Sequence, residues 1–78
     1  MLNKKEQLWL DSVQKALNAC PVSLKARADS YTIGDADITI FDNDKYIDKG
    51  KDVCVDVDES GAKLATLVFP FGVWSTSG

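Results

Sequence analysis

Polar and apolar positions alternate along residues 52–58, and a second segment with the character of a strand follows over residues 62–70. Val53, Val55 and Val57 are each separated by one residue, which is the period expected of a strand with one buried face. Gly61 can adopt the positive φ that a tight return between two strands requires. The pattern predicts that the two segments form a β-hairpin and that this hairpin is the centre of a sheet.

The turn at Gly61 decides which side chains of this hairpin are buried. A type I turn with Gly61 as its bulge residue places Val53 and Val55 on the core face with Ala65, Leu67, Phe69 and Phe71. A two-residue turn at Ser60 and Gly61 would shift the pairing by one and split this apolar face. We favour the first register because it keeps the apolar side chains together. The outer face then carries six residues, Asp52, Cys54, Asp56, Leu64, Thr66 and Val68.

A single amphipathic helix is predicted over residues 3–19. Asn3 and Glu6 have the spacing of a capping box, in which each side chain accepts a hydrogen bond from the backbone N–H of the other residue. Pro21 ends the helix because it disfavours helical geometry in the residue before it. At 3.6 residues per turn, Leu8 falls on the polar side of the helix. The apolar stripe comprises Leu2, Trp9, Leu10, Val13, Ala16, Leu17 and Cys20.

Two further strands are predicted between the helix and the hairpin, over residues 30–33 and 36–42. Tyr31 and Ile33 stand at odd positions and Ile38 and Ile40 at even ones, so the alternation changes phase near Gly34. Gly34 belongs either to a turn between two strands or to a bulge in one longer strand, and we favour the turn. The expected fold is α+β, a single domain over residues 1–78 with a polar tail at 75–78. One N-terminal amphipathic helix is packed on an antiparallel meander sheet of about four strands.

Composition is that of an ordinary globular domain, with 45% hydrophobic and 27% charged residues. The formal net charge is −3, with five basic and two acidic residues through Ala28, and four basic and ten acidic residues from Asp29 onward. Because an acidic surface repels phosphates, direct binding to nucleic acid is disfavoured. No apolar run approaches the roughly 20 residues that cross a bilayer, and no signal-peptide pattern precedes Asp11. We therefore expect a cytoplasmic protein without a membrane partner.

The residue types that catalysis and metal binding need are sparse. The sequence contains no histidine, which excludes imidazole bases and imidazole metal ligands. Cys20 and Cys54 are too far apart for a C-x-x-C pair, too few for a tetrahedral zinc site, and not expected to form a disulfide in a reducing compartment. The aspartates of residues 42–48 depart from the calcium-loop pattern because Ile47 stands where glycine is needed. We expect no enzyme activity, no cofactor and no metal.

By elimination, the sequence predicts a small acidic binding protein, a modulator or inhibitor whose partner is another protein. The predicted contact surface is the outer face of the hairpin together with Trp74. Trp74 either packs over the core or stands exposed as an anchor for a partner, and we favour core closure. The short length, the α+β pattern and the segregated acidic charge resemble accessory or inhibitor proteins encoded by phages and prophages.

Two alternative functions stay open on the sequence alone. A structural protein would associate with itself through a free strand edge or through the face of Leu64 and Val68, so a homo-oligomer is also considered. A DNA mimic would present carboxylates at phosphate-like spacings to a nucleic-acid-binding partner. The aspartates available to a mimic are Asp35, Asp37, Asp42, Asp44, Asp48, Asp52, Asp56 and Asp58.

Overall fold

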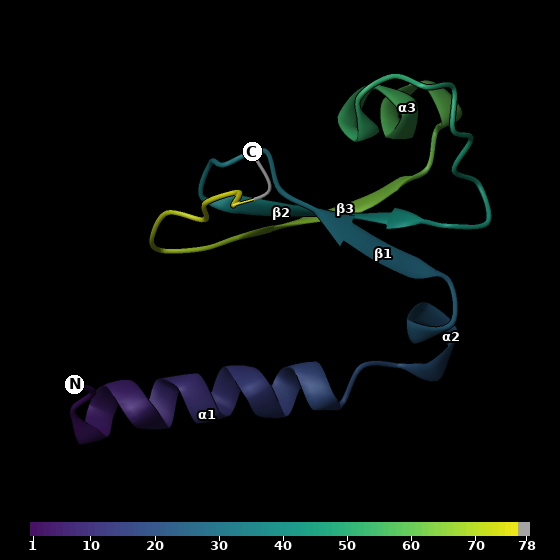
Figure 1. Ribbon diagram of the computed structural model, residues 1–78. Helices are drawn as coiled ribbons and strands as arrows, with labels where there is room; N and C mark the ends of the chain where they lie inside the picture. Colours follow the sequence, from purple (N-terminus) through teal and green to yellow (C-terminus); the bar gives the residue numbers. More distant parts are fainter. Residues whose placement is uncertain (77–78) are drawn as a thin grey trace.

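The computed structural model of the chain describes residues 1–76 and has an α+β fold (Figure 1). A long N-terminal helix precedes an antiparallel sheet. A second substantial helix follows the second strand and precedes the third along the chain. In chain order, the elements of the described range are α1 (Lys4–Asn18), α2 (Val22–Lys25), β1 (Ala28–Tyr31), β2 (Asp37–Asp42), α3 (Val53–Ser60) and β3 (Lys63–Val68).

The three strands pair in chain order, β1–β2–β3, and both pairings are antiparallel. In β1 and β2, Ser30 lies opposite Ile40, while in β2 and β3, Thr39 lies opposite Thr66. The sheet of the described residues therefore has three strands and not about four. Gly34, with φ of 100°, lies in the loop between β1 and β2, which confirms the turn and excludes the bulge.

Helix α1 forms where its capping box and Pro21 predict. The side chain of Asn3 accepts a hydrogen bond from the N–H of Glu6 at 2.8 Å, and the side chain of Glu6 accepts one from the N–H of Asn3 at 2.8 Å. These two bonds satisfy backbone donors that the first turn of a helix otherwise leaves without partners. The prediction of a helix over residues 3–19 is thus confirmed, with α1 observed over Lys4–Asn18.

The prediction of a strand over residues 52–58 is wrong, because this segment forms helix α3. Asp52 occupies the N-cap position, and its carbonyl accepts hydrogen bonds from the N–H groups of Val55 and Asp56, each at 3.0 Å. Gly61 ends the helix in the left-handed region with φ of 67°, a common role of glycine after the last helical residue. The choice between two hairpin registers at Gly61 therefore does not arise, and the predicted strand 62–70 is observed as β3, which pairs with β2.

The core lies on one face of the sheet, beneath α3. Among the described residues, the buried apolar side chains are Phe41, Val57 and Ala62, with exposed fractions of 7%, 0% and 0%. The rings of Tyr31 and Tyr46 flank Phe41, with centroid distances of 6.1 Å and 5.4 Å. The predicted core face of the hairpin is wrong for the same reason as the predicted strand. Five of its six members are exposed, namely Val53, Val55, Ala65, Leu67 and Phe71.

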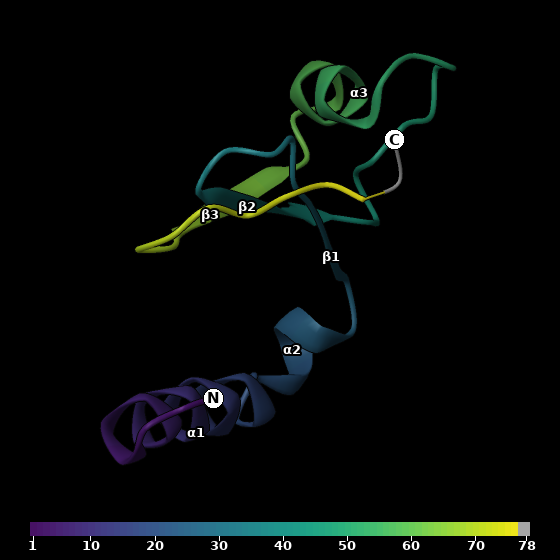
Figure 2. The same ribbon diagram turned by 60° about the vertical axis from the view of Figure 1, so that its left-hand side comes forward.

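Helix α1 lies on the side of the sheet opposite α3 (Figures 1 and 2). None of its fifteen residues, all within the described range, is buried. The ring of Trp9 meets that of Phe71 edge to face, with centroids 6.1 Å apart and an interplanar angle of 76°. The helix thus approaches the sheet through an aromatic contact near the C-terminus, and most of its apolar stripe stays accessible.

Shortening Val57 to alanine is expected to lower the free energy of unfolding by about 2 kcal/mol, because it removes two fully buried methyl groups. Val53→Ala is the matched control on the same helix, since Val53 is 43% exposed, and it is expected to cost less than about 0.5 kcal/mol. Urea unfolding followed by circular dichroism measures both values. Equal losses in the two variants would contradict a core centred on Val57.

Candidate functional site

The predicted outer face of the hairpin does not exist as one surface. Three of its residues, Asp52, Cys54 and Asp56, lie on or at the start of α3, and the other three, Leu64, Thr66 and Val68, lie on β3. Within α3, Asp52 is exposed, Cys54 is half-buried with a free thiol, and Asp56 is fully buried. The six residues therefore cannot meet a partner together.

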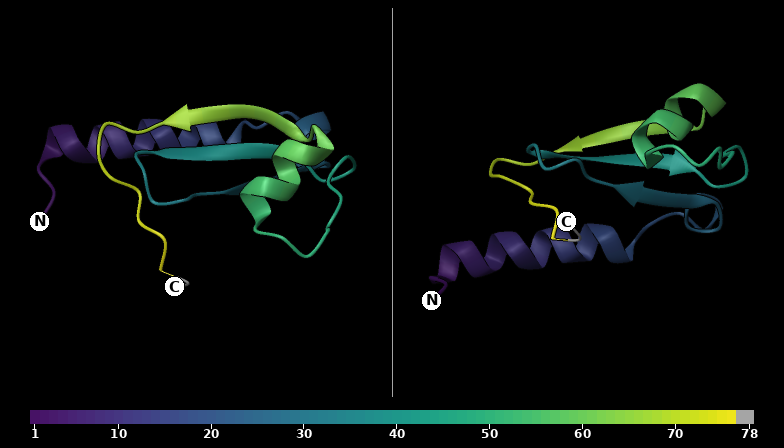
Figure 3. Two further views of the ribbon diagram at one scale, coloured as in Figure 1. Left: turned by 90° about the horizontal axis from the view of Figure 1, so that it is seen from above. Right: turned by 45° about the horizontal axis from the view of Figure 1, so that its top comes forward.

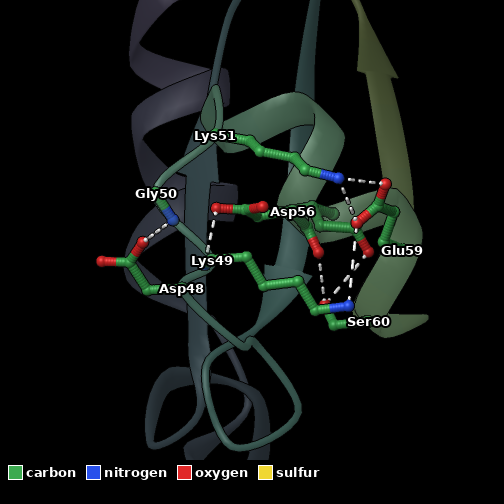
Figure 4. A network of polar contacts seen from close by, with 8 residues as sticks. Asp48, Lys49, Gly50, Lys51, Asp56, Glu59 and Ser60 are labelled. Atoms are coloured by element: carbon green, nitrogen blue, oxygen red, sulfur yellow. Dashed lines mark hydrogen bonds and ion pairs between the residues drawn. The ribbon is translucent and has the colours of Figure 1, made fainter.

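Asp56 holds the loop that precedes α3 (Figure 4). One carboxylate oxygen, Oδ2, accepts a hydrogen bond from the backbone N–H of Lys49 at 3.1 Å, while the other, Oδ1, has no hydrogen-bond partner. Beside it, the ammonium groups of Lys51 and Lys49 approach the carboxylate of Glu59 at 2.9 Å and 3.7 Å. Glu59 stands near the C-terminus of α3, where a negative charge is unfavourable, and the two lysines offset that charge. These acids stabilise the local fold and are not free for a partner.

Asp42 joins the start of β1 to the end of β2. Its Oδ2 lies 2.6 Å from Nη1 of Arg27, and its Oδ1 accepts a hydrogen bond from the N–H of Asp44 at 2.9 Å. Burial of the carboxyl raises its pKa, but the hydrogen bonds from Asp44 and Arg27 and the positive charges of Arg27 and Lys45 outweigh this effect. The pKa of Asp42 is therefore held below its ordinary value of 3.8.

Burial also shapes the titration of Tyr46, whose ring packs on Phe41. Removal of the phenol from water raises its pKa above the ordinary value of 10.0, and the negative charges of Asp48 and Asp56 raise the pKa further. The phenol therefore stays neutral through the physiological range. The ring of Tyr46 covers the core at Phe41.

A different group of exposed apolar residues gathers at the end of the sheet remote from α3. Ile33, Val68 and Trp74 are 64%, 79% and 85% exposed, and we call them the loop-end surface. After β3 the chain turns back along the loop that joins β1 and β2 (Figure 3). Two backbone hydrogen bonds hold it there, from Phe69 N–H to the Ala36 carbonyl at 2.7 Å and from Val73 N–H to the Asp35 carbonyl at 3.1 Å.

The indole of Trp74 is the most exposed part of this surface. The prediction that Trp74 packs over the core is wrong. Its side chain is exposed, as in the alternative. Its side chain borders a shallow hollow of about 340 Å³ together with Ile33, Gly34 and Ser75. Gly72 lies close beneath the ring, since a Cβ at that position would stand 3.3 Å from Nε1 of Trp74. The ring therefore rests on bare backbone and presents its remaining surface outward.

Sequence reasoning identified Val68 and Trp74 as candidates but missed Ile33. A signal was present, because Ile33 precedes Gly34 at the position where the alternation of the two strands changes phase. The predicted tail at 75–78 lies in part outside the described residues, and Ser75 and Thr76 are exposed.

The loop-end surface offers contact chemistry, namely an aromatic ring and two branched aliphatic side chains. Nowhere in residues 1–76 do three or more histidine, cysteine or acidic side chains converge as metal ligands would. Among the helices of that range, none has both the length and the apolar character needed to cross a membrane. The arrangement is suited to burial against another molecule.

Replacing Asp42 with asparagine is expected to lower the stability of the protein at neutral pH, since the charge that pairs with Arg27 is lost. Because the folded-state pKa of Asp42 lies below 3.8, its ionised form stabilises the fold above that pH, and the stabilisation disappears as pH falls through the lowered value. The difference in unfolding free energy between wild type and Asp42→Asn should shrink as pH falls below 3.8. Urea titrations at several pH values measure it, and a difference independent of pH would contradict the assignment.

In comparisons with known proteins, the chain matches no family model, no curated protein and no solved structure.

Proposed function

We propose that this chain is a small non-catalytic binding protein that acts on another protein through the loop-end surface. The observation that carries the proposal is the 85% exposure of Trp74, a residue type whose burial often dominates the energy of protein interfaces. Ile33 borders the same hollow as Trp74, and Val68 is exposed at the end of β3. An exposed apolar patch of this kind is typical of interaction sites.

Charge around the surface indicates which partners would fit. Asp35 is exposed in the loop that the C-terminal segment follows, and Asp37 begins the strand next to it. A partner with an apolar pocket for Trp74 and basic residues at the pocket's edge would complement both features. The proposal keeps the class expected from the sequence, a modulator or inhibitor that resembles phage and prophage accessory proteins.

The alternative of a DNA mimic receives little support from the positions of the acids. Asp42 and Asp56 are buried, so neither presents phosphate-like charge to a partner. Asp29 is hydrogen-bonded to the side chain of Asn43, and the carboxylate of Glu59 is matched by two lysines. A mimic needs carboxylates ranked on one surface, whereas several acids of this chain are committed to internal contacts.

Affinity capture from the native cell with three variants tests the proposal. Trp74→Ala and Val68→Asp are each expected to reduce the captured amount of the same protein at least about tenfold, because each removes an exposed apolar side chain from the proposed interface. Val22→Asp is the matched control, since Val22 is 80% exposed on α2, away from the loop-end surface. Circular dichroism spectra should be equal for all variants, because all three residues are largely exposed.

The pattern of loss decides the outcome of this experiment. A protein retained by Val22→Asp and lost from both loop-end variants supports the proposal. Retention by all variants, or equal loss from the control, would rule out the loop-end surface as the binding site.

A further inference from the structure

A second apolar surface, which meets the loop-end surface at Val68, runs along α1 and the sheet face that α1 approaches. On α1, Trp9, Leu10 and Leu17 are 44%, 38% and 57% exposed, although their spacing puts them on the one stripe that an amphipathic helix normally buries. On the sheet, Leu67 is 46% exposed and lies opposite Ile38 in the strand pairing. Both sides are apolar, and neither is covered.

Hollows lie along this surface instead of packed side chains. One of about 450 Å³ is bordered by Leu2, Trp9, Leu10 and Phe71. Another of about 180 Å³ is bordered by Trp9 and Val13 of α1 and, at the end of the sheet, by Leu67, Val68 and Phe69. Protein interiors are close-packed, so an apolar surface with unfilled hollows on this scale is an incomplete core.

The exposed area of the whole chain supports the same conclusion. The chain exposes 6179 Å², whereas a compact monomer of 8.5 kDa is expected to expose about 4,700 Å². Its radius of gyration is 14.7 Å, compared with about 11.5 Å for a compact domain of 78 residues. The surplus of about 1,500 Å² exceeds the roughly 800 Å² per partner that a stable interface of standard size buries.

We propose that α1 of a second copy of this chain packs against the α1 stripe and the adjoining sheet face, forming a two-fold symmetric dimer. The spacing of the stripe is compatible with two-fold symmetry, because Val13 lies midway between Trp9 and Leu17. Two antiparallel α1 helices that cross at Val13 therefore present the same residues to each other. Each copy would then fill the hollows of the other.

The acidic residues leave the α1 side of the sheet open to a second copy. Six of the ten acids that follow Ala28 lie in loop 43–52 or on α3, on the side of the sheet opposite α1 (Figure 1). These six are Asp44, Asp48, Asp52, Asp56, Asp58 and Glu59.

Two leucines of α1 make the proposal testable with a matched pair of variants. Leu8 and Leu17 are both 57% exposed, but Leu17 belongs to the apolar stripe and Leu8 to the opposite side. Replacing either with lysine adds the same charge and keeps a good helix former. Lysine at position 17, close to the C-terminus of α1, is also favoured by the helix dipole, so the loss of a dimer cannot be attributed to the loss of the helix.

Sedimentation equilibrium of the full chain, from micromolar to millimolar concentration, is the measurement. Wild type and Leu8→Lys are expected to approach twice the 8.5 kDa monomer mass with the same dissociation constant. Leu17→Lys is expected to raise that constant at least about tenfold, since symmetry places the substitution in the interface twice. Trp74→Ala, which alters the loop-end surface, should associate like wild type, and this separates the dimer from the proposed function.

Two results would overturn the proposal. One is a wild-type protein that stays monomeric at every concentration. This result overturns the dimer even if the α1 stripe is then found to bind phosphatidylglycerol vesicles. The other is a dimer that Leu17→Lys and Leu8→Lys weaken equally, because the stripe would then not be the interface.

Discussion

The packing of Val57 against Phe41 and Ala62 is the contact on which the rest of the fold depends. It seats α3 on one face of the sheet and provides the only fully buried apolar side chains among residues 1–76. Gly61 makes this contact possible, since its left-handed conformation ends α3 and lets Ala62 follow at once under the helix. The N–H of Ala62 then bonds the carbonyl of Val57 at 3.0 Å, and its carbonyl accepts from Asp42 at 2.8 Å, so helix, strand and core meet within a few residues.

Acidic charge, the most evident compositional feature of the chain, is used largely to support this arrangement. Asp42 and Asp56 are both buried, and each holds a neighbouring segment by accepting backbone hydrogen bonds. A buried carboxylate is tolerated when hydrogen bonds and opposite charges replace its water. Asp42 has Arg27 as its ionic partner, whereas Asp56 relies on the amide of Lys49 and leaves one oxygen unpaired. Loop 43–52 is thus held to α3 by this one carboxylate oxygen and by the ion pairs of Lys49 and Lys51 with Glu59.

A one-sided core explains why two apolar surfaces stay open elsewhere. With only a few side chains buried under α3, the opposite sheet face and α1 contribute little to the stability of the monomer, and the aromatic contact of Trp9 with Phe71 is what brings them together. The loop-end surface carries Trp74, which borders a hollow with Ile33. A dimer through α1 would complete the core and leave Trp74 free, so the two proposals describe one molecule with a structural interface and a separate binding surface.

The sequence by itself determined the elements whose signals are local. The capping box at Asn3 and the stop at Pro21 specify α1, and the turn at Gly34 specifies the hairpin of β1 and β2, because these rest on backbone chemistry within a few residues. The state of residues 53–60 was decided by tertiary structure. Val53 and Val57 suit a strand face at period two and a helix face four residues apart, and only burial of Val57 against Phe41 distinguishes the two. The candidate site, too, was determined in part by the sequence and in part by the tertiary structure. Val68 and Trp74 were identified from residue type, but their meeting with Ile33 depends on backbone hydrogen bonds between segments more than thirty residues apart, which no local pattern encodes.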